Sequence, residues 1–261
     1  MNNETELKNI VKEKYGEIAK NSKSCCCGSS KIVDYTIMKD NYDHLQGYVK
    51  EADLGLGCGI PTEFANINPG NIVIDLGSGA GNDVFVARSI VGETGLVIGV
   101  DMTEDMIDLA EKNKTKLGIE NVQFRLGEIE QLPIEDNFAD VVLSNCVLNL
   151  VPNKEKAFSE IYRVLKEDGH FCISDIVLLG ELPAQFKKSA ELYAGCVSGA
   201  LQQNEYIGLI EKSGFKDVKI VKSKPITLPD SVLIQYLSPG EIEDYKKNQI
   251  GIFSITVYGN K

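Results

Sequence analysis

The pattern of apolar and polar residues along the chain changes at Asn71. From there to Leu178, short apolar runs typical of buried strands alternate with longer stretches in which apolar residues recur at helical spacing. Strands that alternate with helices in this way form right-handed βαβ units and a parallel sheet, so the sequence predicts an α/β fold. The runs predict strands over residues 71–77, 96–101, 122–127, 140–145 and 170–178, and the periodic stretches predict helices over 82–92, 103–118 and 153–169.

Both ends of the chain carry further predicted elements. Before the alternating region, residues 4–20 have apolar positions at helical spacing, and a small polar loop with three adjacent cysteines follows them. After the alternating region, the pattern predicts a helix over 205–214 and strands over 216–223 and 252–259, joined by a connection.

These patterns divide the chain into two regions. Residues 1–70 hold the N-terminal helix, the cysteine-rich loop and an approach segment, and residues 71–261 hold the α/β domain. Within the domain, residues 180–203 interrupt the alternation of strands and helices. This segment is long enough for a lid, and we expect it to cap the acceptor side of the sheet.

Composition and charge exclude several classes of partner. The 261 residues are 43% apolar and 25% charged, as in ordinary soluble proteins, and the net charge is -11. Because the chain is so acidic, it is poorly suited to neutralise phosphates. We therefore expect that it binds neither nucleic acid nor an anionic membrane surface. The N-terminus has no apolar core, and no apolar run is long enough to span a membrane. We therefore expect a cytoplasmic protein whose seven cysteines are thiols.

A glycine-rich turn lies between the first predicted strand and the helix after it. Its sequence, VIDLGSGAGND, places Gly77, Gly79 and Gly81 where the chain turns tightly and a ligand approaches the backbone. The spacing differs from the dinucleotide fingerprint, which has a further glycine where this chain has Asn82. Asp75, at the end of the strand, disfavours a pyrophosphate and favours a cationic ligand such as S-adenosylmethionine.

Two later acids follow the next two strands. Asp101 ends the second strand about 20 residues past the turn, where a ribose-binding acid is usual, and Met102 beside it can pack on an adenine face. Glu128 follows the third strand and is placed to accept from an adenine amino group, with the amide of Ile129 as a nearby donor. Each acid alone has a simpler interpretation as a solvated strand end. Their order and spacing together favour S-adenosylmethionine over NAD.

The cysteines fall into three groups. Cys58, Cys146 and Cys196 lie beside glycine or in loops, where the topology brings them towards the carboxyl ends of the strands and the expected ligand. Cys172 lies inside a predicted buried strand, and the ordinary role of a lone cytosolic cysteine as an inert core residue fits it best. The adjacent cysteines at 25–27 have no packing role in a polar loop, so we interpret them as thiols for soft-metal capture or disulfide exchange.

Three thiols that converge near the methyl group of a sulfonium cofactor indicate that the methyl acceptor is a soft metal or metalloid. Thiolates select soft centres, and trivalent arsenic keeps a lone pair after it has bound three sulfurs. That lone pair can attack a methyl group in line without a base, so catalysis would be mostly positioning. The chain has two histidines. We interpret His44 as a structural or surface residue and place His170 at the wrong end of the sheet for a base.

The glycine-rich turn and the segments after it resemble the class I S-adenosylmethionine-dependent methyltransferases. VIDLGSGAGND, VIGVDMT and GEIEQLPIEDNFADVVLSN match successive motifs of that superfamily between Val73 and Asn145, and we include Asn145 among the predicted cofactor residues. The resemblance implies a Rossmann-like, seven-stranded, mostly parallel sheet with an antiparallel last strand and helices on both faces. The N-terminal arm and the cap segment are additions to that fold.

A narrower resemblance covers nearly the whole chain. KEKYGEIAKNSKSCCC, YVKEADLGLGCGIPT, LSNCVLNLVPNKEKAFSEIYRVLKEDG and GCVSGAL are similar to the arsenite methyltransferases. It implies that Cys58, Cys146 and Cys196 hold trivalent arsenic and that one cysteine of the triplet joins them in thiol–disulfide exchange. We assign Cys26 to that role, with its two neighbours as alternatives. The resemblance also implies a monomer. Many members carry a sizeable C-terminal domain, of which little is present here.

We therefore predict an enzyme that transfers methyl groups from S-adenosylmethionine to arsenite and methylarsenite in arsenic detoxification, with glutathione or a thioredoxin-like protein as the thiol reductant. One alternative is a carbon or oxygen methyltransferase of the quinone or sterol type, which needs a base and leaves the loop thiols unexplained. The other is a non-catalytic soft-metal binding protein on the same fold, and the intact cofactor motifs speak against it.

Overall fold

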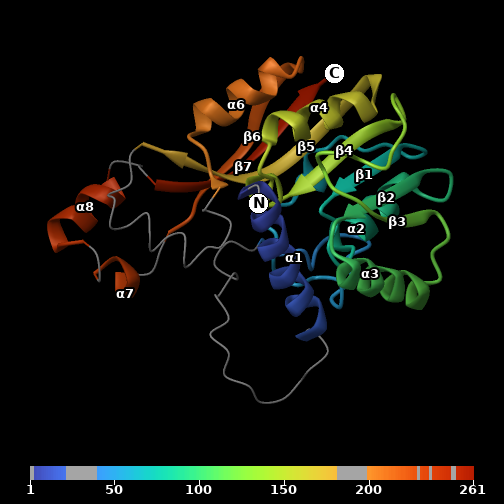
Figure 1. The fold of residues 1–261 in the computed structure, drawn as a ribbon, viewed down its shortest axis with the longest axis horizontal. Coiled ribbons are helices and arrows are strands. Elements are labelled where there is room, and N and C mark those ends of the chain that lie inside the picture. The colour runs from blue at the N-terminus through green and yellow to red at the C-terminus, as the bar shows by residue number, and fades with distance from the viewer. Residues whose placement is uncertain (1–2, 22–39, 181–198, 228–229, 235–236, 248–250) are drawn as a thin grey trace.

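The computed structural model describes residues 3–21, 40–180, 199–227, 230–234, 237–247 and 251–261. Within these ranges, seven strands form one sheet in the order β3-β2-β1-β4-β5-β7-β6 (Figure 1). The strands are β1 (Ile72–Leu76), β2 (Leu96–Asp101), β3 (Val122–Leu126), β4 (Ala139–Asn145), β5 (Leu165–Leu179), β6 (Lys216–Pro225) and β7 (Gly251–Asn260).

The directions of the strands confirm the predicted sheet. The five strands from β1 to β5 run parallel, and their apolar residues meet across the centre, where Val73 lies opposite Val97 on one side and Val141 on the other. The last strand, β7, lies between β5 and β6 and is antiparallel to both. The carboxyl ends of the parallel strands therefore share one edge, as the sequence requires for a ligand site.

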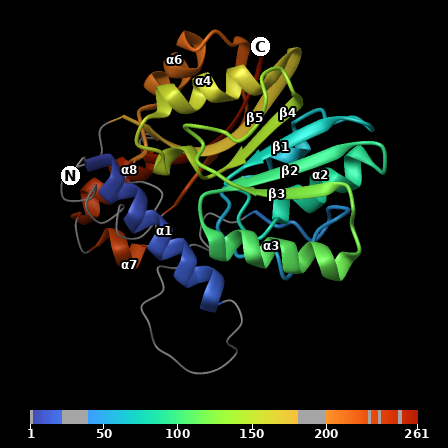
Figure 2. The ribbon, with the colours of Figure 1, turned by 45° about the vertical axis from the view of Figure 1, so that its right-hand side comes forward.

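Helices cover both faces of the sheet. The helices α4 (Lys154–Val164) and α6 (Gln203–Lys212) lie together on one face, and α2 (Asn82–Val91) and α3 (Glu104–Leu117) lie on the other (Figure 2). The approach segment after residue 40 joins the second group, since Ala52 and Ala65 pack against α2. It includes the short 3₁₀ helix η2 (Pro61–Glu63), and a second one, η3 (Leu148–Leu150), follows β4.

The N-terminal helix α1 (Asn3–Asn21) packs outside the sheet, beside α3 (Figures 1 and 2). Its last turn is tied to α3 by an ion pair of 2.9 Å between Lys20 Nζ and Asp105. This packing buries only some of the apolar side chains of α1, because Leu7 and Ile10 remain exposed. The predicted helix is thus confirmed, and its place next to the sheet edge matters for the site.

Two predicted elements differ from the structure. The helix expected to reach residue 169 ends at Val164, because Leu165 turns extended and pairs with Ala139 in the sheet. The connection before the last strand contains two short helices, α7 (Asp230–Leu233) and α8 (Pro239–Lys247). They are too short for a clear apolar period; α8 is instead fixed by Ser238, whose N–H and hydroxyl both donate to Glu241.

Parts of the predicted organisation fall outside the described residues. The cysteine triplet lies in 22–39, and most of the predicted cap segment, with Cys196, lies in 181–198. Among the helices that are described, none is long and apolar enough to cross a membrane.

Candidate functional site

One cleft opens at the carboxyl ends of the parallel strands, and most of the predicted cofactor residues meet in it. Residues from the ends of four different strands contribute to its wall, as expected where the strand order reverses between β1 and β4. Gly81 does not line the cleft; it precedes the first residue of α2. Cys146 does line it. The predicted cofactor residues in the lining are Asp75, Gly77, Gly79, Asp101, Met102, Glu128, Ile129 and Asn145.

The glycine-rich turn needs its glycines for two reasons. Gly77 and Gly81 have φ angles of 67° and 96°, in the left-handed region that side chains disfavour. Close packing adds to this, since a Cβ on Gly77 would lie 2.5 Å from the side chain of Val147, and one on Gly81 would lie 2.8 Å from Phe85. The turn therefore presents backbone to the cleft, as a bound cofactor requires.

Asp101 holds this turn from the end of β2. Its carboxylate accepts hydrogen bonds from the backbone N–H of Gly79, at 3.0 Å, and of Thr103, at 2.9 Å. Burial raises the pKa of Asp101 above its ordinary value, and the two backbone bonds oppose that shift. The acid is thus oriented at the rim of the turn, where the predicted ribose hydroxyls would reach it.

Asp75 lies deeper in the cleft and is almost fully buried, with 3% of its surface exposed. Burial raises the pKa of Asp75 well above its ordinary value, and the nearby carboxylates of Asp83 and Asp101 raise it further. The buried Asp75 and Asp83 and the half-buried Asp101 thus bring three carboxyl groups together at one end of the sheet. Such a cleft favours a cationic ligand and disfavours a pyrophosphate.

The N-terminal helix closes one side of the cleft, which the sequence did not predict. Val11 and Tyr15 line the cleft from α1. Lys8 Nζ lies 2.7 Å from Glu128, the predicted adenine acceptor, and also pairs with Glu130. The Lys8 ammonium holds the pKa of Glu128 below its ordinary value, so this acid is ionised at neutral pH.

Two polar atoms of the turn are buried without a partner in the described part of the chain. They are Ser78 Oγ and Asn82 Oδ1, and both residues line the cleft. An unsatisfied buried polar atom is costly, so these two indicate a polar ligand that completes them. Asn82 entered the prediction only as an argument against a dinucleotide, and Ser78 was not predicted as a site residue. The place of both residues inside the glycine-rich motif was the available signal.

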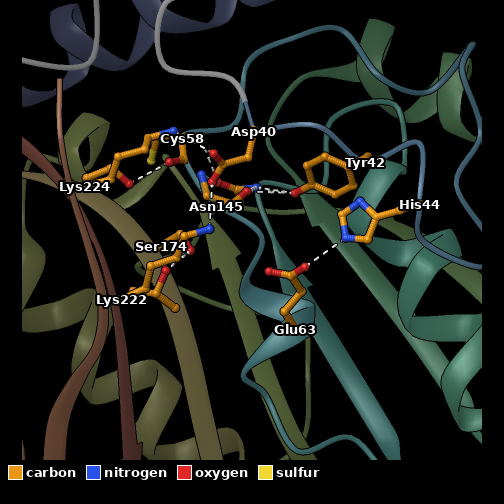
Figure 3. Close-up of polar contacts among 12 residues, drawn as sticks. Asp40, Tyr42, His44, Cys58, Glu63, Asn145, Ser174, Lys222 and Lys224 are labelled. Carbon is orange, nitrogen blue, oxygen red and sulfur yellow. Dashed lines mark hydrogen bonds and ion pairs between the residues drawn. The ribbon is translucent and has the colours of Figure 1, made fainter. Parts of the chain in front are cut away.

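Asn145 connects the approach segment to the strand ends (Figure 3). Its side-chain nitrogen lies 2.9 Å from the hydroxyl of Tyr42, the carbonyl of Gly59 and the carboxylate of Asp83. Its side-chain oxygen accepts from the backbone N–H of Cys58 at 3.0 Å. The predicted role of Asn145 in cofactor binding stays a prediction; in the described chain its amide organises the protein.

Asp83 and Tyr42 complete this network, and neither was predicted as a site residue from the sequence. Tyr42 donates to Asp83 at 2.9 Å, and both side chains are buried. Burial raises the pKa of Asp83 to about 6, although its bonds from Asn145 and Tyr42 oppose the shift. Asp83 is 41 residues from Tyr42 and 62 residues from Asn145, so no local sequence pattern predicts these contacts.

Cys58 is fully buried between the approach segment and the sheet, and it does not line the cleft. Besides the bond from its N–H to Asn145, its carbonyl accepts from the hydroxyl of Ser254 on β7 at 2.6 Å. Its neighbour Gly59 packs so closely on β5 that a Cβ there would lie 2.5 Å from the Ser174 hydroxyl. Residues of the strands thus contact the glycine-rich segment around Cys58 on both sides.

Cys146 follows β4 in an unusual backbone conformation. Its φ of 63° lies in the left-handed region, which is strained for a residue with a side chain. Its N–H donates to the carbonyl of Ser174 on β5 at 2.8 Å, which holds the turn in place. The residue is buried at 2% exposure and lines the cofactor cleft. Strained positions of this kind concentrate at functional sites.

The remaining cysteines divide as the sequence analysis expected, as far as the structure describes them. Cys172 is a free thiol in the core, packed among the residues under α2, and burial raises its pKa. Cys26 and Cys196 lie outside the described residues. The described part of the chain contains no group of three potential metal ligands, and the predicted three-thiol site stays a prediction.

The two histidines lie away from the cleft. His44 is exposed and contacts Glu63 at 3.0 Å. His170 lies on β5 opposite Val141, towards the end of the sheet away from the cleft. Its ring stacks on Tyr258, and its Nε2 lies 2.6 Å from the carbonyl oxygen of Ala65. Neither residue lines the cleft, so neither is placed as a base for methyl transfer.

Comparisons with known proteins agree with this geometry. Residues 67–214 match the family described as "Methyltransferase domain". The arsenite methyltransferase of Aquipseudomonas alcaligenes is 34% identical to this chain, and the match covers 87% of this chain and 67% of the relative. The chain belongs to the arsenite methyltransferase family. The arsenite methyltransferase of Halobacterium salinarum is 41% identical over 82% of this chain.

A solved structure supports the same assignment. The crystal structure of CrArsM, an arsenic(III) S-adenosylmethionine methyltransferase from Chlamydomonas reinhardtii, has a TM-score of 0.64 and 36% identity, covering 78% of this chain and 67% of that one. The match to the Halobacterium arsenite methyltransferase covers 59% of that relative's length. This chain thus spans about three fifths of that curated relative.

Proposed function

We propose that the protein transfers a methyl group from S-adenosylmethionine to trivalent arsenic held by cysteine thiolates. One observation carries the proposal: Asn145 binds the backbone of Cys58 and directly precedes Cys146, and both Asn145 and Cys146 line the cofactor cleft. This contact holds the backbone of Cys58, which is far away in sequence, against the residue next to Cys146, and Cys146 lines a cleft suited to a cationic cofactor. Family membership supports the same activity.

The cleft residues fit S-adenosylmethionine. Asp75 supplies negative charge for the amino group and the sulfonium, and Asp101 is oriented for the ribose hydroxyls. Glu128 and the amide of Ile129 suit the adenine edge, while Met102 packs against its face. The cofactor can also form hydrogen bonds with the two buried oxygens of the turn, Ser78 Oγ and Asn82 Oδ1, which have no partner in the described part of the chain. When bound, this cofactor supplies a methyl group on a positively charged sulfur.

The cysteines provide the acceptor. Arsenite exchanges its oxygen ligands for the sulfurs of Cys58, Cys146 and Cys196, and the bound arsenic keeps a lone pair that points at the methyl group. No proton leaves the arsenic in the methyl transfer, which agrees with a cleft that has no histidine in its lining. The task of the protein in that step is to hold two reactants in line.

The finer parts of the proposal concern thiols that the structure does not describe. Cys196 supplies the third sulfur, and Cys26 exchanges disulfides with the site during turnover. Glutathione or a thioredoxin-like protein restores the thiols, and the protein works as a cytoplasmic monomer in arsenic detoxification. Methylarsenite is a second substrate, since it has one position already filled by carbon and needs only two thiolates.

The test is an incubation of the protein with S-adenosylmethionine, glutathione and arsenite, followed by analysis of the arsenic species. Methylated arsenic supports the proposal. Tight arsenic binding without methylation would instead favour the non-catalytic soft-metal protein. Cofactor binding with no arsenic binding would favour a methyltransferase for an organic acceptor.

A further inference from the structure

The N-terminal helix α1 forms part of the cofactor cleft, although it lies outside the sheet (Figure 2). Lys8, Val11 and Tyr15 line the cleft from this helix. Glu128, the residue proposed to accept from the adenine amino group, lines the same cleft and contacts Lys8. The helix therefore covers the end of the cleft in which the adenine ring is proposed to bind.

Ion pairs join α1 to this end of the cleft. Lys8 Nζ lies 2.7 Å from Glu128 and also pairs with Glu130, and Lys12 Nζ lies 3.9 Å from Glu128. Lys8, Glu128 and Glu130 together are called the Lys8 cluster below. Its two carboxylates come from the segment directly after β3, so one side chain of α1 is held by two acids of the body of the protein.

Apolar packing holds α1 only in part. Val11 and Ala19 are buried, whereas Leu7 and Ile10 remain exposed. A helix that buries only some of its apolar side chains is held less firmly than a helix of the core, so its polar contacts with the body matter more. The ion pairs of α1 are therefore expected to decide how long it stays docked.

The Lys8 cluster is better placed for this than the pair at the other end of the helix. The side chains of Lys8 and Glu130 are 22% and 7% exposed, whereas those of Lys20 and Asp105 are 67% and 38% exposed. Glu130 is fixed further, because its carboxylate accepts from the N–H of Asn153 at 3.0 Å. Partly buried and fixed charges are screened less by solvent and salt than exposed ones, so the Lys8 pairs contribute more.

We propose that Lys8 is a positioning residue for the cofactor, which through Glu128 and Glu130 holds α1 closed over the adenine end of the cleft. A carboxylate offers about four lone pairs, so Glu128 accepts from Lys8 and from the adenine amino group at the same time. The bound adenine and the docked helix then stabilise one another, and the closed helix slows release of the cofactor. The inference rests on the proposed function, because it needs S-adenosylmethionine to bind in this cleft.

The experiment follows the release of the reaction product, S-adenosylhomocysteine, and needs no arsenic. Tritium-labelled S-adenosylhomocysteine is bound to the protein and displaced by an excess of the unlabelled compound. Lys8→Met removes the charge but keeps an unbranched side chain that favours the helix. Glu130→Gln removes the opposite charge, leaves α1 unchanged and keeps an oxygen that accepts from Asn153. Lys20→Met is the matched control, since Lys20 lies on the same helix but does not line the cofactor cleft.

We expect S-adenosylhomocysteine to dissociate on the order of 10-fold faster from Lys8→Met and from Glu130→Gln than from the wild-type protein. The double variant should release it about as fast as Lys8→Met alone, because both changes break the same pairs. Release from the wild-type protein should become faster as salt rises from about 0.05 M to about 0.5 M, and release from Lys8→Met should change little. Lys20→Met should behave as the wild-type protein does.

Hydrogen exchange over residues 4–21 measures docking of the helix itself. S-adenosylhomocysteine should slow the exchange of these amides in the wild-type protein and slow it less in Lys8→Met. A folded Lys8→Met protein with wild-type release rates would overturn the inference, as would exchange in α1 that does not respond to the ligand. If the wild-type protein binds no S-adenosylhomocysteine, the cofactor assignment fails and the role of Lys8 fails with it. If release behaves as expected but no methylated arsenic forms, only the proposed acceptor fails.

Discussion

The backbone N–H of Cys58 donates a hydrogen bond of 3.0 Å to the side chain of Asn145, the residue directly before Cys146. This single contact joins two cysteine positions that are 88 residues apart (146 − 58). The same side chain also binds Tyr42 and Asp83, which are both buried. The backbone of Cys58 is thus held beside the residue that precedes Cys146, and less ordering of the chain remains to be done when arsenic binds.

Replacing Asn145 by alanine should damage arsenic capture through this contact. The variant leaves the Gly59 carbonyl and the Asp83 carboxylate short of donors, so we expect unfolding in urea to need about 1–3 kcal/mol less free energy. We also expect weaker arsenite binding. The matched control is Asn121→Ala, since Asn121 likewise ties Arg88, Gly92 and Gly95 together, but in the loops before β2 and β3. Asn121→Ala should cost stability and spare arsenite binding; equal arsenite affinity in both variants would contradict the role of Asn145.

Much of the fold was predictable because it depends on residues close in sequence. The strands, the helices α1 to α3 and the acids at strand ends follow from local periodicity and from glycines that adopt positive φ, such as Gly77. The short helices α7 and α8 were not predicted because neither is long enough to show an apolar period, and the first turn of α8 is fixed by the bonds between Ser238 and Glu241.

The polar contacts that organise the site escaped for a different reason. Lys8 contacts Glu128 across 120 positions, and Tyr42 contacts Asn145 across 103. Side chains paired over such separations leave no repeating signal in a single sequence. The sequence could therefore name the residues at strand ends, but not the partners that hold them.

Removing the carboxylate of Asp101 should weaken cofactor binding. Asp101→Ala loses the acceptor for both ribose hydroxyls and also frees the Gly79 N–H, so we expect S-adenosylmethionine affinity to fall by about 1.5–3 kcal/mol. Isothermal calorimetry measures this directly. Asp108→Ala is the control because Asp108 is exposed on α3. Unchanged affinity in Asp101→Ala, or binding of NAD by the wild-type protein, would refute the cofactor assignment.

Cofactor binding should release protons near pH 6. Burial brings the pKa of Asp83 to about 6, so this carboxyl is partly protonated in the free protein at that pH, and burial also raises the pKa of Asp75 and of Asp101 above their ordinary values. A sulfonium favours their ionised forms and lowers those pKa values on binding. Affinity should therefore rise as the pH increases from about 5 to about 7.5.

Calorimetry in two buffers with different ionisation enthalpies measures the number of protons exchanged. S-adenosylhomocysteine is the matched control ligand, since its sulfur carries no charge and it should release fewer protons. Proton uptake on binding of S-adenosylmethionine, or equal release with both ligands, would show that the buried acids do not respond to the sulfonium.

Cys58 should be needed for the first methylation more than for the second. Methylarsenite takes only two thiolates, which Cys146 and Cys196 can supply, so Cys58→Ser should abolish methylation of arsenite and spare much of that of methylarsenite. The backbone of Cys58 is held by Asn145 and Ser254 independently of its sulfur, so the change should leave the site in place. Both activities are assayed with excess glutathione. Equal loss of the two would argue against two-thiolate binding.

The most direct measurement of the central claim is methyl transfer to arsenic already bound to the protein. The chain is loaded with arsenite, freed of excess, and mixed with S-adenosylmethionine carrying a labelled methyl group in a single turnover. The account predicts label on arsenic in the wild-type protein and in Cys172→Ala, whose thiol is buried in the core, and none in Cys146→Ser. Wild-type protein that binds both arsenite and cofactor but transfers no label to arsenic, or Cys146→Ser that transfers it normally, would contradict the account.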